Sequence, residues 1–197
     1  MRTIFKISAI IIVLISILST AFYFIYWTKT PTYSLKMLEE SVQTNNIKTF
    51  EKYFDLNVIC EKSFDDILAI KKKNRTISIL AYLFNPIDKI KAIGSLKTRT
   101  INFIKGQSGG HTITDSKDFS IKKVEIENKT DKMVLATIEF KDSPQGKIPT
   151  TIVKMVKLDN GIWQVKEIVN WEDILSTLGE DQYWLFPEFP KHNPKIT

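Results

Sequence analysis

The stretch that decides the fold class is MVLATIEFK, residues 133–141 of a 197-residue chain. Apolar side chains stand at positions 134, 136, 138 and 140, and Thr137 and Glu139 fall between them. Successive side chains of a β-strand point to opposite faces, so this alternation predicts a strand with one buried face and one solvated face. Such a strand is typical of an antiparallel sheet.

The neighbouring stretches have the same period and complete a predicted meander of about four strands. One strand is expected before residues 133–141, at 119–126, and two more are expected at 148–158 and 162–169. The last two are joined by Asp159-Asn160-Gly161, and Asn-Gly accepts the positive φ angles of a tight hairpin turn. This part of the chain therefore predicts sequential antiparallel strands.

Upstream of the strands, the apolar spacing is that of helices. Apolar stripes occupy residues 35–42, 47–54 and 58–70, and another runs from Asn85-Pro86 to Gly106, a glycine suited to ending a helix. Residues 77–84 are apolar all round and are expected to be buried, and a short helix is expected from Trp171 to near Gly179. Helices followed by sequential strands predict an α+β fold, with the helices packed on a curved antiparallel sheet.

Two parts of this pattern resemble known families. The last hairpin, Asn160-Gly161-Ile162-Trp163-Gln164-Val165, is similar to the Gly-x-Trp-x-Val run of cystatin-like domains, the superfamily that includes nuclear transport factor 2-like domains. The stretch from Tyr33 through Asn45-Asn46 to Asp55 resembles an uncharacterised bacterial membrane-anchored family, domain of unknown function 2939. These resemblances imply a cystatin-like fold and a membrane location, and the second family has no established activity to transfer.

Residues 7–27, ISAIIIVLISILSTAFYFIYW, contain no charge. About 20 apolar residues cross the hydrocarbon core of a bilayer as a helix, and aromatic residues such as those at 22–27 are favoured at its interface. Arg2 and Lys6 precede the segment and only Lys29 closely follows it, so the positive-inside rule predicts a cytoplasmic N-terminus. We expect a cytoplasmic stub at 1–6, a transmembrane signal anchor at 7–27, a tether at 28–31, an exported α+β domain at 32–179 and a tail at 180–197.

Two other interpretations of residues 7–27 stay open. Ser19-Thr20-Ala21 is a small-x-small cleavage site of the kind found in a cleavable signal peptide. The apolar stretch is longer than the roughly 7–15 residues of a signal-peptide core, which favours an uncleaved anchor. A buried helix of a soluble protein is the remaining interpretation. In the first two, the domain lies outside the cytoplasmic membrane, in a periplasmic or extracellular compartment.

The net charge of +6 is unevenly distributed along the chain. Residues 1–30 carry three bases and no acid, so +3 remains on the rest, which is not the composition of a nucleic-acid-binding protein. Residues 60–106 hold ten bases against four acids. We interpret this half as a solvated helix surface; contact with anionic lipid or a cell-wall polymer is the alternative.

Residues that bind metal or act as nucleophiles are scarce. The single cysteine, Cys60, excludes an internal disulfide and is expected to be a buried, unreactive side chain. His111 and His192 have no second ligand at metal spacing. Gly106, Gly109 and Gly110 are not followed by a helix that could hold a phosphate. The sequence therefore predicts neither a metal nor a cofactor.

The carboxylates give no recognisable acid–base pair. Asp55 is expected to cap the end of the second helix, Asp65 and Asp66 to be exposed on the third, and Glu139 to face solvent on its strand. General acid–base catalysis needs a carboxyl group with a shifted pKa next to its reacting partner. We therefore expect no enzymatic activity.

The C-terminal tail carries the most distinctive candidate. Five large apolar side chains fall within residues 183–189, and they either cover the sheet or dock on a membrane partner or the bilayer surface. These candidate docking residues are Tyr183, Trp184, Leu185, Phe186 and Phe189.

A curved sheet of this kind can enclose a cone, and Phe140 and Trp163 are the candidate residues for its lining. If these side chains fill the cone, we expect a binding or scaffolding module for an envelope or membrane partner. The alternative is a small-molecule- or lipid-binding pocket in the cone, with or without enzymatic activity.

Overall fold

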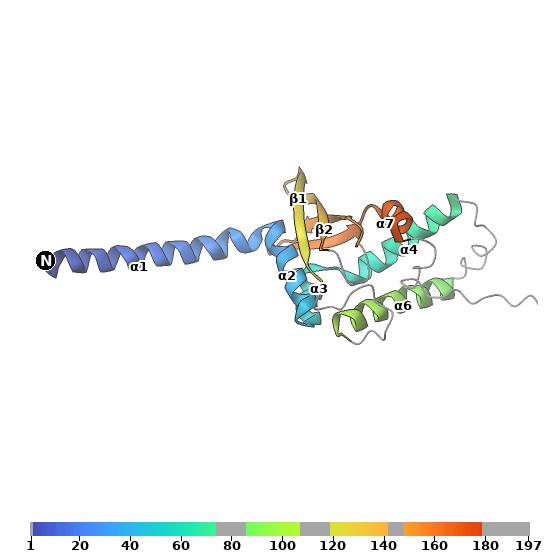
Figure 1. Ribbon diagram of the computed structural model, residues 1–197, viewed down its shortest axis with the longest axis horizontal. Helices are drawn as coiled ribbons and strands as arrows, with labels where there is room; N and C mark the ends of the chain where they lie inside the picture. Colours follow the sequence, from blue (N-terminus) through green and yellow to red (C-terminus); the bar gives the residue numbers. More distant parts are fainter. Residues whose placement is uncertain (1, 74–85, 107–118, 142–147, 179–197) are drawn as a thin grey trace, which may run out of the picture.

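The computed structural model describes residues 2–73, 86–106, 119–141 and 148–178. In these ranges the chain has an α+β fold, which confirms the predicted class and the predicted order of helices and strands (Figure 1). The helices are α1 (Arg2–Ile25), a short 3-10 helix (Trp27–Lys29), α2 (Pro31–Gln43), α3 (Ile47–Tyr53), α4 (Leu56–Lys73), α6 (Pro86–Ile104) and α7 (Trp171–Leu178). The strands are β1 (Ile121–Thr130), β2 (Met133–Phe140), β3 (Thr151–Lys157) and β4 (Trp163–Ile168).

The four strands form an antiparallel meander in the order β1-β2-β3-β4. Val134, Ala136 and Ile138 of β2 are buried and the residues between them are only half-buried, as the alternation predicts. The first strand ends later than expected: β1 continues to Thr130, four residues beyond the predicted end at 126. The third strand begins at Thr151, three residues later than expected.

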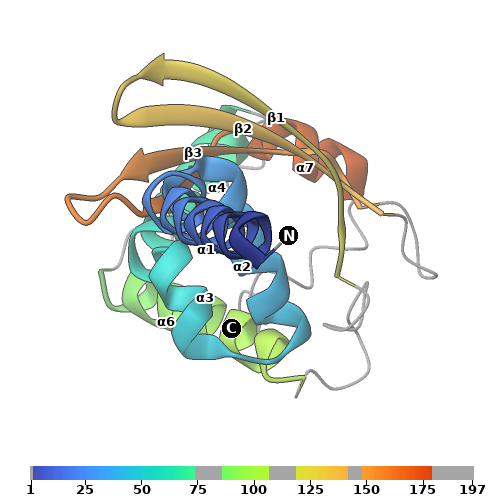
Figure 2. The same ribbon diagram turned by 90° about the vertical axis from the view of Figure 1, so that its left-hand side faces the viewer.

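One face of the sheet is covered by helices. Seen along α1, the strands arch over α2 and α3 (Figure 2). Leu35 of α2 and Met155 of β3, each 1% exposed, lie in the same buried cluster. The other buried members of this cluster are Leu38, Val42, Phe50, Tyr53, Ile59, Ile104, Val134, Ala136, Ile138, Val153, Trp163 and Val165.

Local signals set the boundaries of the helices. The Thr30 hydroxyl accepts a hydrogen bond from the Tyr33 N–H at 3.1 Å, and Pro31 occupies the first turn of α2. Asn45 has φ 55° after α2, and the Asn46 side chain caps α3 by accepting from the Thr49 N–H at 3.1 Å. Gly106, with φ 65°, lies just beyond α6, as predicted.

Asp55 corrects one sequence expectation. Its carboxylate does not end the second helix; it accepts from the Val58 N–H at 3.2 Å and so caps the beginning of α4. α4 accordingly begins at Leu56, two residues before the expected position.

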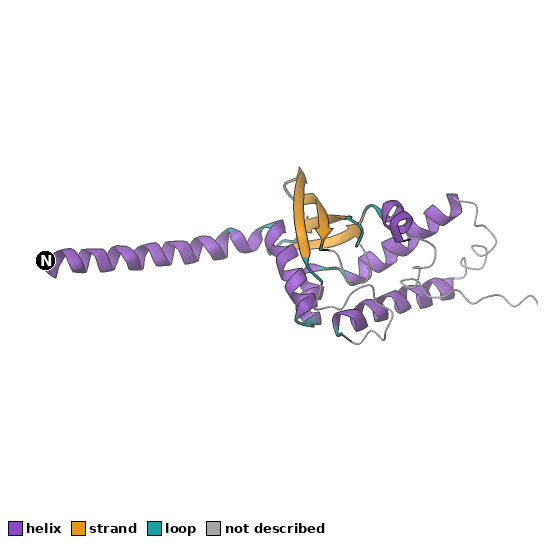
Figure 3. Cartoon of the chain, in the orientation of Figure 1, coloured by secondary structure: helices purple, strands orange, loops and turns teal. Residues whose placement is uncertain are grey.

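The helices α4, α6 and α7 form a second, smaller assembly beyond the sheet. Figures 1 and 3 show α4 and α6 extending from the sheet on the side away from α1. Phe64, Cys60 and Ile93 are buried between α4 and α6, and Leu175 of α7 packs against Ile67 of α4. The described parts of the basic stretch, residues 60–73 and 86–106, therefore lie largely away from the N-terminal helix.

α1 stands apart from the rest of the molecule (Figure 1). Residues 10–29 are long and apolar enough to cross a membrane, and this window is 0% buried. Its large side chains are exposed, Leu18 and Phe22 among them at 68% and 63%. A helix with these properties can serve as a membrane anchor or as a signal sequence.

Candidate functional site

The segment expected as a tether is fixed to the sheet. Residues 27–29 form a 3-10 helix, and the Trp163 indole N–H donates to the Lys29 carbonyl at 3.0 Å. Gly161, with φ 83°, lies against the Lys29 side chain, and a Cβ at this position would come within 2.9 Å of Lys29 Cδ. The β3–β4 hairpin turn and Trp163 thus hold the chain where it leaves α1. We call these contacts the anchor joint.

The hairpin turn between β3 and β4 determines where Trp163 lies. The Asn160 side chain accepts from the Ile162 N–H at 3.0 Å, and Leu158 and Ile162 close the hairpin with a backbone hydrogen bond of 2.8 Å. This turn places Trp163 opposite Lys157, on the helix-covered face, where the indole is 6% exposed. A buried indole needs a hydrogen-bond acceptor, which the Lys29 carbonyl supplies.

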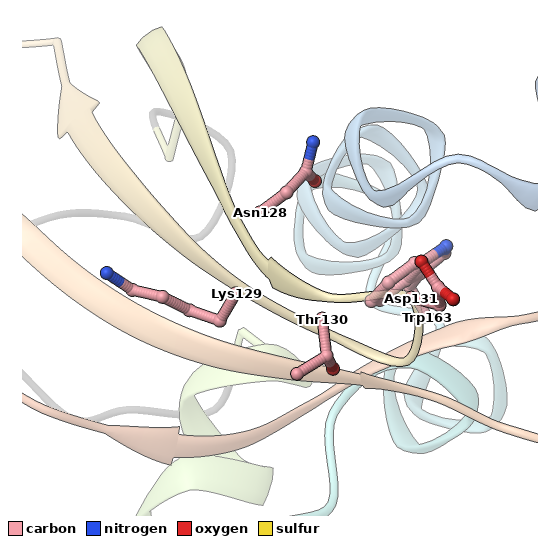
Figure 4. Close-up of a pocket in the computed structure, with 5 residues that line it drawn as sticks. All are labelled: Asn128, Lys129, Thr130, Asp131 and Trp163. Atoms are coloured by element: carbon pink, nitrogen blue, oxygen red, sulfur yellow. The ribbon is translucent and has the colours of Figure 1, made fainter.

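A hollow of about 350 Å³ lies beside the anchor joint (Figure 4). It is lined by Asn128, Lys129, Thr130, Asp131 and Trp163, from the end of β1, its turn and the start of β4. Asn128 is opposite Val134, so its side chain lies on the helix-covered face of the sheet. The hollow therefore lies at the end of the sheet next to α1, where the helices no longer cover this face.

Several lysines belong to the hollow or to the segments next to it. Lys157 Nζ lies 5.8 Å from the centre of the Trp163 ring, and the Lys157 N–H donates to the Lys132 carbonyl at 2.9 Å. Among the described residues, Lys29, Lys132 and Lys157 have no ion-pair partner. Lys129 pairs with Glu127, and Figure 4 shows its side chain directed away from Asn128 and Trp163. Of the lysines in this region, only Lys129 thus has a carboxylate counter-ion in the described structure.

A second set of charges attaches α4 to the sheet. Asp55 accepts from Lys166 Nζ at 2.5 Å, and Glu167 pairs with Lys62 at 2.7 Å and with Lys154 at 3.4 Å. Burial is the largest single influence and raises the pKa of both carboxyl groups. The hydrogen bonds and charges of these lysines, joined at Asp55 by the backbone N–H groups of Val58 and Asn57, together outweigh it, so the net pKa of each is lowered. Both carboxylates are therefore held ionised by structural partners.

Trp163 and Phe140, the two candidate cone residues, lie at opposite ends of the sheet. Trp163 lies at the anchor joint, and Phe140 packs on Phe119 with ring centres 5.2 Å apart. Phe140 packs on the same buried cluster that includes Trp163. Between them, the helix-covered face is filled by side chains of the main cluster.

The other sequence candidates are placed as follows. Cys60 is buried, and burial raises the pKa of its thiol to about 11, so the thiol stays protonated. Asp65 pairs with Lys89 of α6 at 2.7 Å, and Glu139 is half-exposed. His111, His192 and the docking candidates Tyr183, Trp184, Leu185, Phe186 and Phe189 lie outside the described residues.

Sequence reasoning missed the anchor joint. The Asn-Gly turn and Trp163 were both identifiable, but no local pattern links Trp163 to Lys29, which is 134 residues away. The one available signal was a tryptophan two residues after a tight turn, because a buried indole requires a hydrogen-bond partner.

Comparison with known proteins gives no relative from which a function could be transferred. No protein-family model matches the chain, and no curated protein and no solved structure shows significant similarity to it.

Proposed function

We propose that this protein is a single-pass membrane protein with a cytoplasmic N-terminus, whose cystatin-like domain lies outside the cytoplasmic membrane and binds or scaffolds an envelope or membrane partner. In this proposal α1 is an uncleaved anchor rather than a signal peptide. Its exposed apolar surface and its flanking charges, Arg2 and Lys6 against Lys29, support that topology.

The observation that carries the proposal is the anchor joint. A domain that binds its own juxtamembrane segment through Trp163 and Gly161 is held at one orientation to the helix. A fixed orientation presents the same surfaces to other membrane-bound molecules and raises their effective concentration without a deep binding site. This geometry favours a binding or scaffolding role over a role that depends on free diffusion.

The packing of the sheet favours binding through the outer surface of the domain. Leu35, Met155 and their neighbours occupy the helix-covered face of the sheet. The small-molecule pocket that formed the alternative would need this volume. The family resemblance to domain of unknown function 2939 is compatible with the proposal and adds no activity.

Topology is tested first. Alkaline phosphatase and green fluorescent protein are each fused after Thr197, and the membranes are washed with carbonate. We expect an active phosphatase, a dark fluorescent fusion, and protein that stays in the carbonate-resistant pellet at full length. Cleavage near Ala21 or a fluorescent cytoplasmic fusion would contradict the proposal.

Partner binding is tested by cross-linking mass spectrometry from membranes. The intact chain is compared with a variant in which Tyr183, Trp184 and Phe186 are replaced by Ala, and with a control carrying Lys123→Gln on the exposed edge strand. We expect a reproducible membrane or envelope partner for the intact chain and the control, and loss of that partner in the tail variant with the circular dichroism spectrum unchanged. Absence of any partner for the intact chain would contradict a scaffolding role.

A further inference from the structure

The hollow beside the anchor joint is placed at the level where α1 leaves the bilayer, if α1 is the anchor proposed above. Trp163, which lines the hollow, donates to the carbonyl of Lys29 at 3.0 Å. Lys29 lies four residues after the end of α1, a distance of about one helical turn. The anchor therefore places the hollow at the depth of the lipid headgroups.

The aromatic surroundings agree with this depth. The ring of Phe22, in the last turn of α1, stacks on that of Tyr26, the first residue after α1, and both residues are more than 60% exposed. Tyrosine and other amphipathic aromatic rings are favoured where hydrocarbon meets headgroups. The hollow follows these rings by only a few residues along the chain.

Groups of both positive and negative charge lie at the hollow. On the cationic side, Lys157 Nζ lies 5.8 Å from the centre of the Trp163 ring, which lines the hollow, and Lys157 has no ion-pair partner in the described part of the chain. The Asn128 amide adds a hydrogen-bond donor from the same face of the sheet. On the anionic side, Asp131 lines the hollow. A ligand that satisfies both sides carries both an anionic group and a hydrogen-bonding cation.

We propose that this hollow binds the headgroup of a phospholipid that carries both a phosphate and a primary ammonium group, as a phosphoethanolamine headgroup does. The phosphate is bound by Lys157 and Asn128, and the ammonium group is bound by Asp131. A purely anionic headgroup would leave Asp131 facing like charge, and a choline headgroup offers it no N–H donor. The inference rests on the proposed membrane anchoring and adds a lipid class to it.

The test uses the full-length protein in nanodiscs that contain equal amounts of phosphatidylethanolamine, phosphatidylglycerol and phosphatidylcholine. Lipids retained after release are counted by native mass spectrometry. We expect phosphatidylethanolamine to be enriched over the other two. Lys157→Gln should lower its retention about fivefold, the effect of one lysine at a membrane surface. Asp131→Asn should remove the preference for phosphatidylethanolamine over phosphatidylglycerol while lipid retention persists.

Lys123→Gln is the matched control. Lys123 is an exposed lysine of β1, near the other end of the strand and paired with Glu125, so its variant should retain lipids as the unchanged protein does. Equal retention of all three lipids, a preference for phosphatidylglycerol, or a Lys157→Gln variant that behaves like the control would overturn the inference. Carbonate extraction of the same samples separates the two proposals: a washed-out protein contradicts the anchor, whereas an integrated protein without lipid preference contradicts only the headgroup site.

Discussion

The half of the domain next to α1 and the half farther away are built differently. Near the anchor, the sheet and helices α2 and α3 share one continuous cluster in which Leu35, Val134 and Met155 are each 1% exposed. Farther away, α4, α6 and α7 are joined by two smaller clusters, around Phe64 and around Leu175, with ion pairs at their edges. Burial is thus concentrated where the chain leaves the proposed membrane.

This difference predicts that the two halves differ in local stability. Free energies of local opening follow the density of buried apolar contacts, so the anchor-proximal half should be the most stable unit and the distal half should open first. A stable unit beside the anchor keeps the hollow and the anchor joint in fixed geometry. A less stable distal half can change shape when a partner binds without disturbing that geometry.

The strongest test of the comparison is Trp163→Ala. Removing a buried tryptophan costs about 3–5 kcal/mol of unfolding free energy, and here the variant also loses the bond to Lys29. Urea denaturation in detergent, followed by circular dichroism, measures the loss. Trp163→Phe keeps most of the ring and loses the N–H, so it should cost less. A loss below about 1 kcal/mol for Trp163→Ala would contradict a central role for the anchor joint.

The next test compares equivalent truncations in the two halves. Met155→Ala in the main cluster and Leu175→Ala in the distal one both fall in the range of about 2–5 kcal/mol for buried large-to-small substitutions. We expect Met155→Ala near the upper end, because residues surrounded on all sides cannot collapse into the cavity. Leu175→Ala should fall near the lower end, since only a small cluster surrounds it. Equal losses of unfolding free energy, measured by urea denaturation, would contradict the proposed difference in packing between the two halves.

Gly161→Ala is a finer probe of the anchor joint. The substitution places a Cβ 2.9 Å from Lys29 Cδ and forces a non-glycine residue to φ 83°, which costs about 1–2 kcal/mol. In a Lys29→Ala background the steric part disappears and only the backbone strain remains. A double-mutant cycle by thermal denaturation therefore measures the contact itself. The same loss in both backgrounds would mean that Lys29 and Gly161 are not in contact.

The fold could be predicted from the sequence wherever one local cause decides the structure. The alternation at 134–140 fixes the buried face of β2, and Gly161 and Gly106 end their elements because their backbones adopt positive φ. Asn46 lies between the two predicted apolar stripes at 35–42 and 47–54 and is the cap of α3. Each of these signals lies within a few residues of its effect.

The candidate site could not be predicted in the same way. The hollow combines the turn after β1 with Trp163, and the anchor joint combines Trp163 with Lys29, so both depend on strand register and on how the sheet meets α1. Asp55 was assigned to the wrong helix because a carboxylate between two helices can cap either one from sequence alone. Its N-cap bond to Val58 and its ion pair with Lys166 decide in favour of α4.

The smallest predicted effect concerns the connection between the two halves. Asp55 and Glu167 join α4 to β4 and have lowered pKa values in the folded protein. A lowered pKa means that the pairs stabilise the fold above about pH 4, the ordinary range of a carboxyl group, and lose that contribution as the pH falls through the folded-state pKa.

Asp55→Asn keeps an oxygen that can cap α4 but removes the charge that pairs with Lys166. We expect a loss of about 0.5–1 kcal/mol at pH 7, as for a partly exposed ion pair, and convergence with the unchanged protein near pH 2. Urea midpoints across this pH range give the measurement, and Glu125→Gln, which breaks an exposed pair on β1, should leave them unchanged. No difference at any pH, or a difference that does not change with pH, would mean that the charge of Asp55 does not stabilise the fold. The connection between α4 and β4 would then depend on apolar contact and on the Glu167–Lys62 ion pair.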